Sequence, residues 1–192
     1  MGIDLKNKNF VFYLIILSCG NAVTQSYVVS IPFWLEAAYH IPVTEIALYL
    51  FPILYTGMRL PFLPSYIAKK VSERNRTILY MTLFVLGGLT PFILMQLDNA
   101  PAWVWIVPGV LSAMGVVGMS PYLSYNAMKQ LGNSYNSASS LLSICSYVSG
   151  GTAILITLRI TIPSFYWEGI FILCLAMIMC YLFWKLRHAK KV

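Results

Sequence analysis

The chain alternates long apolar stretches with short polar connectors. A helix of about 20 apolar residues is long enough to cross the hydrocarbon core of a bilayer. Six stretches meet this length, at residues 10–33, 45–67, 77–97, 103–128, 137–158 and 165–184. The connectors leave no room for a soluble domain. The pattern therefore predicts an all-α membrane protein in which residues 1–192 form a single domain of six transmembrane helices.

The composition agrees with this pattern. Hydrophobic residues make up 59% of the 192 residues and charged residues 10%, and the mean hydropathy is +0.73. A soluble domain carries about 25% charged residues, so this chain has too few charges to cover a water-soluble globule. The net charge is +7. Its basic residues stand at the ends of the apolar stretches and form no patch on a soluble fold, so we expect no nucleic-acid partner.

Lysine and arginine are distributed unevenly between the two sides of the predicted membrane. Eleven of the 13 fall on the side that holds both termini, Arg159 falls on the opposite side, and Arg59 falls inside the second stretch. An excess of these residues marks the cytoplasmic side. We therefore expect both termini in the cytoplasm and insertion in the plasma membrane, which in a bacterium is the inner membrane.

The sequence offers few groups for catalysis or metal binding. His40 and His188 fall in a connector and in the tail, and the four cysteines lie inside apolar stretches without metal-ligand spacing. The acidic residues on the predicted outer side all stand at or near the ends of stretches: Glu36, Glu45, Asp98 and Glu168. A buried dyad or metal centre needs such groups close together in the interior. We therefore expect neither an enzyme nor a bound cofactor.

The stretches differ in polarity, and this difference predicts which of them face lipid. Stretches 77–97 and 165–184 carry few polar residues, so we expect them to be peripheral, with Ile172 facing lipid. Stretches 10–33 and 103–128 carry many, so we expect them to line an interior or aqueous surface. The small residues of stretch 137–158 indicate either static close packing or a sliding contact between helices.

Several polar side chains in these stretches are candidates for lining a substrate cavity. Asn21 and Gln25 are four residues apart and share one helical face, as do Tyr122 and Asn126. Such side chains avoid lipid and hydrogen bond to one another, to water or to a solute.

Arg59, four residues after Tyr55, is the charge inside a predicted span. If this helix ends near Ile67, the guanidinium lies ~12 Å inside that end, at about 1.5 Å per residue. A charge at that depth is costly unless it meets water, a partner or a substrate. Arg59 therefore either snorkels to the interface or faces a cavity. Tyr55 and Arg59 complete the set of candidate cavity residues.

Three segments resemble a known family of transporters. Residues 30–45 are similar to the loop after the seventh helix of Bcr/CflA-type drug-efflux transporters, where Ser-Pro-Phe-x-Leu leads to Tyr-Gly-Leu-Ser-Pro-x-x-Phe. Here His40 replaces the glycine and Ile46 the aromatic residue. Residues 68–76 resemble the family's basic loop between its eighth and ninth helices, with Ser72 where glycine is usual. Residues 131–141 resemble the Gly-x-Ala-Ser-Ala-Leu start of its eleventh helix.

The resemblance implies a fold and a mode of action. It implies that the chain is the carboxy-terminal half of a major facilitator transporter, a six-helix unit built as a 3+3 inverted repeat. Residues 1–9 would then stand where the central cytoplasmic loop ends, and an amino-terminal half would complete the molecule. The first and fourth helices of each half line the cavity, and the third and sixth face lipid. Two halves hold substrate between them at mid-depth.

Three functions follow as alternatives. The chain is the carboxy-terminal half of a split or truncated transporter that exports small amphipathic, drug-like compounds, or a homodimeric half-transporter, or a non-transporting remnant or membrane interaction module. The resemblance implies export in exchange for protons, which is commonly carried by a buried carboxylate. Because the acidic residues stand near helix ends, we expect the chain alone to lack this coupling. Its partners would be the lipid bilayer, a small-molecule substrate, and an amino-terminal half or a second copy.

Overall fold

The computed structural model describes residues 7–59, 73–97, 100–130, 135–161 and 165–189. These residues are almost entirely helical and contain no strand, in agreement with the predicted all-α class. The helices are α1 (Lys8–Tyr39), α2 (Val43–Arg59), α4 (Glu73–Leu94), the short 3₁₀ helix η2 (Ala102–Trp105) that continues into α5 (Ile106–Lys129), α6 (Tyr135–Thr161) and α7 (Tyr166–Ala189).

Five of these segments are long and apolar enough to cross a membrane: Lys8–Tyr39, Asn75–Leu94, Ala102–Lys129, Ser139–Arg159 and Tyr166–Leu186. They correspond to five of the six predicted spans. The remaining predicted span, 45–67, is represented by α2 up to Arg59, and residues 60–67 lie outside the described part of the chain. The helical class is therefore confirmed, and five of the predicted spans are helices that could cross a membrane; the sixth span stays a prediction.

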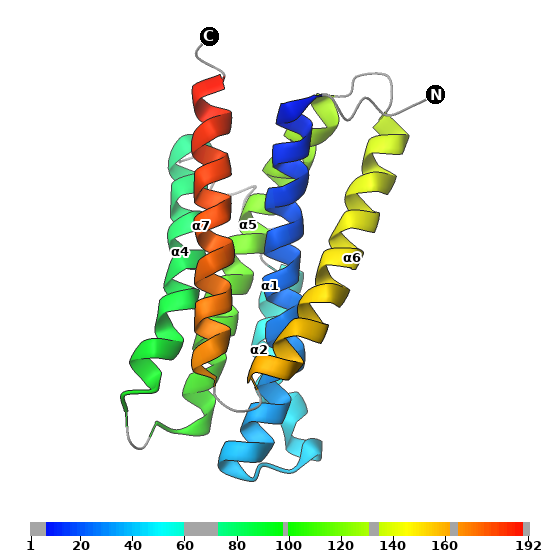
Figure 1. Cartoon of the computed structure of the whole chain (residues 1–192). Coiled ribbons are helices and arrows are strands. Elements are labelled where there is room, and N and C mark those ends of the chain that lie inside the picture. The colour runs from blue at the N-terminus through cyan, green and yellow to red at the C-terminus, as the bar shows by residue number, and fades with distance from the viewer. Residues whose placement is uncertain (1–6, 60–72, 98–99, 131–134, 162–164, 190–192) are drawn as a thin grey trace.

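The helices pack side by side, with α1 at the centre (Figure 1). α1 contacts α2, α5, α6 and α7, whereas α4 packs against α5 and α7 on the far side. The beginning of α1 and the end of α7 lie at the same end of the bundle, as an even number of crossings requires. Lys8 begins α1 and Lys129 ends α5 at this end, whereas Arg159 lies near the opposite end of α6. Which end faces the cytoplasm stays a prediction.

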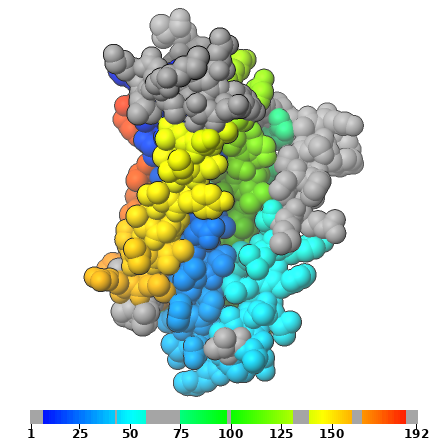
Figure 2. All heavy atoms as spheres, turned by 90° about the vertical axis from the view of Figure 1, so that its right-hand side faces the viewer, coloured from blue at the N-terminus to red at the C-terminus, as the bar shows by residue number. Residues whose placement is uncertain are grey.

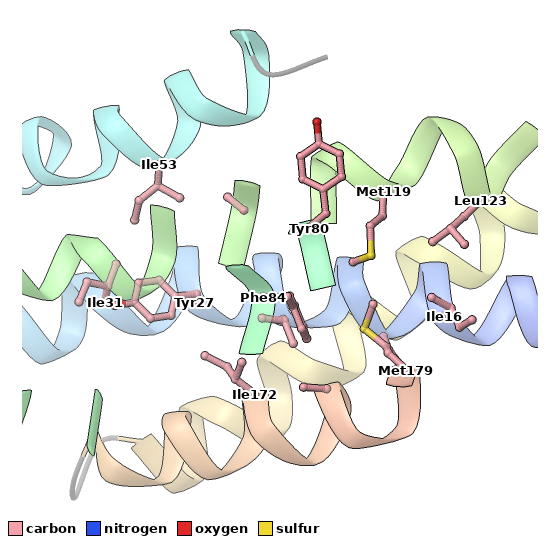
Figure 3. Close-up of a cluster of buried hydrophobic side chains, with 14 of the residues drawn as sticks. Ile16, Tyr27, Ile31, Ile53, Tyr80, Phe84, Met119, Leu123, Ile172 and Met179 are labelled. Carbon is pink, nitrogen blue, oxygen red and sulfur yellow. The ribbon is translucent and has the colours of Figure 1, made fainter. Parts of the chain in front are cut away.

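The core runs along the contact between α1, α4, α5 and α7. Figure 3 shows that Phe84 of α4 and Met119 of α5 lie beside buried side chains of α1 and α7. Ile172, expected to face lipid, is fully buried in this core. A Cβ atom on Gly88 of α4 would lie 2.9 Å from the Ile172 Cγ2. The absence of a side chain at Gly88 therefore lets α7 approach α4 closely, and this brings Ile172 inside.

α1 is longer than the predicted span, and both of its ends have a local cause. At its beginning, the Asn7 Oδ1 accepts hydrogen bonds from the backbone N–H groups of Asn9 (3.1 Å) and Phe10 (3.3 Å), which is the usual N-cap arrangement. At its end, His40 adopts a φ of 53°, in the left-handed region, and its N–H bonds to the Glu36 carbonyl. This conformation terminates helices and favours glycine.

Candidate functional site

A polar groove lies between α1, α5 and α6. Its volume is about 470 Å³, and it is lined by Leu17, Asn21, Thr24, Gln25, Val116, Val117, Ser120, Ser124, Leu142, Ser143, Ser146 and Tyr147. We refer to this set as the polar groove. Its lining residues, all in the described part of the chain, carry hydroxyl and amide groups and no charge. The groove therefore offers hydrogen bonds beside apolar side chains.

The contact between α1 and α6 forms one wall of the polar groove. The Asn21 Nδ2 donates to the Ser146 carbonyl at 2.5 Å, and the Ser149 Oγ donates to the Ser18 carbonyl at 3.0 Å. Gly150 lets the helices come this close, because a Cβ atom there would lie 3.1 Å from the Asn21 Nδ2 and from the Gln25 Cγ. The small residues of α6 thus bring backbone carbonyls within reach of α1, as expected for close packing.

The opposite wall is formed by α5. Ser120 and Ser124 are four residues apart and face the groove from the same side of this helix. At the base, Gly20 of α1 meets Val116 of α5, where an added Cβ atom would lie 3.0 Å from the valine Cγ1. This close approach closes the groove from behind.

The remaining side of the polar groove is open. The Gln25 side chain is exposed, and Tyr147 is 78% exposed at the rim. Among the described residues none makes a hydrogen bond to the Gln25 side chain. Figure 2 shows this face of the molecule, with α6, α5, α1 and α2 all reaching the surface. An incoming molecule could therefore reach the Gln25 amide.

The structure brings two of the six predicted cavity residues together. Asn21 and Gln25 both line the polar groove. Tyr122 lies toward α4, at a small cavity of about 20 Å³ that it shares with Tyr80 and Thr77. The Asn126 Nδ2 donates to the Tyr122 carbonyl at 2.8 Å, one turn away on the same helix. Neither Tyr122 nor Asn126 is among the residues that line the polar groove.

Of the two candidates on α2, Tyr55 does not line the groove. Tyr55 is about half exposed and its ring stacks on Phe51 at a centroid distance of 5.7 Å. Arg59 is the last residue of α2, and its side chain lies outside the described residues. Whether this guanidinium faces a cavity or snorkels to the interface stays a prediction.

Sequence reasoning missed the burial of Glu168. This residue lies near the beginning of α7, as predicted, but its side chain is fully buried against α1. The Ser26 Oγ donates to its Oε1 atom at 3.1 Å. Polar residues at positions 26 and 30, one turn apart on α1, were the available signal. Their partner could not be inferred from a single sequence, because it comes from a helix 142 residues away.

The described residues hold no group of three or more His, Cys, Asp or Glu side chains that could bind a metal ion. What the groove can do chemically is bind a solute through neutral hydrogen-bonding groups and apolar contacts. Compared with known protein families, curated proteins and solved structures, the chain matches none.

Proposed function

We propose that this chain is one six-helix half of a major facilitator transporter of the Bcr/CflA type, and that it exports small amphipathic compounds together with a second six-helix unit. The chain would be the carboxy-terminal half, with the 3+3 inverted repeat of that fold. The polar groove would be its share of the substrate cavity, facing the corresponding surface of the other half.

The observation that carries this proposal is the open side of the polar groove. An amide that faces hydrocarbon without a partner costs about 4–8 kcal/mol by transfer to cyclohexane. Gln25 is exposed on a membrane-embedded helix, near the middle of α1. A surface of this kind is stable when a protein partner, water or a solute covers it. A second six-helix half provides the protein partner, and it also encloses the water and the solute.

The conformation of His40 is compatible with the resemblance. The family pattern has glycine at this position, and His40 adopts a positive φ of 53°. Glycine populates this region without a steric cost. A glycine at this position would form the same turn between the first two helices without a steric cost.

The lining of the polar groove indicates the substrate class. Its polar groups are neutral, and Leu17, Val116 and Leu142 lie beside them. A site of this composition binds compounds that combine apolar surface with a few hydrogen-bonding groups. An amphipathic dye such as ethidium is therefore a suitable probe.

The test is ethidium transport in proteoliposomes that contain the complex purified through this chain. We expect transport by the complex and none by the monomeric chain. Changing both Asn21 and Gln25 to leucine should lower the rate about tenfold, the effect of losing ~1.4 kcal/mol of interaction with the solute. The matched control is Met177→Leu, on the exposed surface of α7, which should transport normally.

Two results would contradict the proposal. Robust transport by the monomeric chain would exclude a half-transporter, and a complex that binds no ethidium would exclude this export function. A complex that contains two copies of the chain and transports the dye would identify the second unit as a homodimer partner. Such a pair is geometrically allowed, because two halves related by an axis along the membrane normal point the same way.

A further inference from the structure

Glu168 presents a carboxyl group in the interior of the bundle. The residue is 0% exposed, and its Oε1 accepts the hydrogen bond from Ser26 described above. Its Oε2 atom is buried and makes no hydrogen bond with the described residues, and the Ser30 hydroxyl, one turn after Ser26, also lies beside the carboxyl group. One oxygen therefore lies within reach of the Ser26 hydroxyl, which also lies 2.9 Å from the Val23 carbonyl of its own helix.

The surroundings of this carboxyl group are apolar or neutral. Tyr27 of α1 is the titratable side chain that faces it, and the Tyr27 hydroxyl donates to the Trp105 carbonyl. Phe165 packs edge-on against Tyr27 at 5.5 Å and against Trp105 at 5.4 Å. On the α4 side, a Cβ on Gly169 would meet Phe92 at 2.8 Å. Within the described residues no lysine, arginine or histidine pairs with Glu168.

Its depth follows from the position of Ser26 on α1. Ser26 lies seven residues before Phe33, the end of the predicted span, which is ~10 Å at about 1.5 Å per residue. Glu168 stands at the beginning of its own helix, yet it packs against the middle of α1. An ionisable group so placed within membrane helices is costly and usually functional, often as part of a proton path.

We propose that Glu168 is a proton-binding site, in which Ser26 positions the carboxyl group and the Oε2 atom takes up a proton from water and returns it to water. A buried, ionised carboxylate needs a positive charge beside it. Without one, burying the neutral carboxylic acid costs much less free energy than burying the ionised form. A metal ion would require several oxygen ligands, whereas a proton requires one free oxygen. The uptake forms one O–H bond and involves no oxidation or reduction.

This site lies next to the polar groove along α1. Gln25 faces the groove, whereas the neighbouring Ser26 faces α7 and bonds to Glu168. A change in the charge of Glu168 acts on the helix that also forms the groove. The inference thus deepens the proposed function, on which it rests for its role in transport, by naming a carrier of the coupling proton within this half.

The experiment is infrared spectroscopy of the purified chain in lipid bilayers at neutral pH, without substrate or partner. We expect the carbonyl stretching band of a protonated carboxyl group in the native chain and its loss in Glu168→Gln. Glutamine keeps the oxygen that accepts from Ser26, so the variant should fold, as checked by circular dichroism and thermal unfolding. Glu36→Gln, at an exposed position on the same helix as Ser26, should retain the band.

A band of equal intensity in the native chain and in Glu168→Gln would overturn the assignment. If the band disappeared when sodium replaced potassium in the buffer, the site would bind sodium and not a proton.

A transport experiment separates this inference from the proposed function. In the complex, Glu168→Gln should still exchange ethidium down its own gradient but lose the response to a proton gradient. If the native complex exchanged no ethidium, the proposed function would be contradicted, whereas the infrared assignment of Glu168 would stand.

Discussion

The bundle has two outer faces that differ in chemistry. On the face formed by α4 and α7, exposed apolar side chains follow both helices, with the exposed Thr82 among them: Leu79, Leu86, Leu89, Ile93, Met177 and Ile178. On the face formed by α1, α5 and α6, exposed Gln25 and Ser143 lie among apolar neighbours such as Tyr147. The first face suits hydrocarbon. The second combines hydroxyl and amide groups with a hollow, which lipid tails satisfy poorly.

The two faces can also be compared by the hydrogen bonds that their hydroxyl and amide groups make. On α4, Thr82 and Thr90 donate to carbonyls of their own helix, at 2.9 and 3.0 Å, so these two hydroxyl groups need no partner from another molecule. At the polar groove, hydroxyl groups do the same, since Thr24 donates to Gly20 and Ser143 to Ser139. Hydroxyl groups therefore do not distinguish the faces. The distinction lies in the two amides of the groove: Asn21 donates to a carbonyl of another helix, and Gln25 has no hydrogen-bond partner among the described residues.

The largest expected effect comes from placing the same charge on each face, which tests whether the two faces have different surroundings. We expect Leu86→Lys, in the middle of the exposed face of α4, to lower the free energy of unfolding by about 2.5–3.5 kcal/mol, the cost of lysine at the centre of a membrane helix. Gln25→Lys should cost less than about 1 kcal/mol, because its ammonium group reaches a hydrated groove. Denaturant titration of both variants in bilayers measures the difference. Equal losses would show that both faces contact hydrocarbon.

A second, smaller effect concerns the wall between α1 and α6. Gly150→Val should cost about 1–3 kcal/mol, the range for inserting methyl groups into a packed contact, because its Cβ atom would already lie 3.1 Å from Asn21 and Gln25. Gly151→Val is the matched control, since an added Cβ at Gly151 has nothing within 4 Å. Thermal unfolding in detergent or bilayers compares the two. If both variants lost the same stability, helix propensity and not packing would be responsible.

The smallest expected effect is the loss of one hydrogen bond across the groove wall. Asn21→Ala removes the donor to the Ser146 carbonyl and should cost ~0.6 kcal/mol, the average for such bonds between membrane helices. Ser143 donates to Ser139 of its own helix at 3.0 Å, so Ser143→Ala should change stability less. The measurement is the unfolding free energy of each variant. A greater loss in Ser143→Ala would mean that the bond across the wall does not stabilise the contact.

Much of the fold could be predicted from the sequence, because transmembrane spans depend on a local property. Mean polarity over about 20 residues is enough to locate a span, and the small residues of stretch 137–158 correctly indicated the close contact that Gly150 makes. The lengths were less predictable. α1 extends to Tyr39 because His40 accepts a left-handed conformation, and no apolar pattern encodes this.

The candidate site could be predicted only in part. Asn21 and Gln25 were identified because two polar residues on one helical face stand out in an apolar stretch. Tyr122 and Asn126 followed the same rule, yet the rotation of α5 directs Tyr122 toward α4. Rotation about a helix axis is set by packing against neighbours and is not encoded in polarity alone. Ile172 and Glu168 illustrate the same limit, since close contacts between distant helices bury both.

The length of α1 has a mechanical consequence. Its 32 residues span ~48 Å at 1.5 Å per residue, well beyond a hydrocarbon core of about 30 Å. A rigid rod of this length acts as a lever, and a tilt of ~5° displaces one end by roughly 4 Å relative to the other. Angular changes too small to disturb the packing at the centre of the bundle are thus amplified at the far end, where Tyr39 bonds to the Ala100 carbonyl at 2.7 Å.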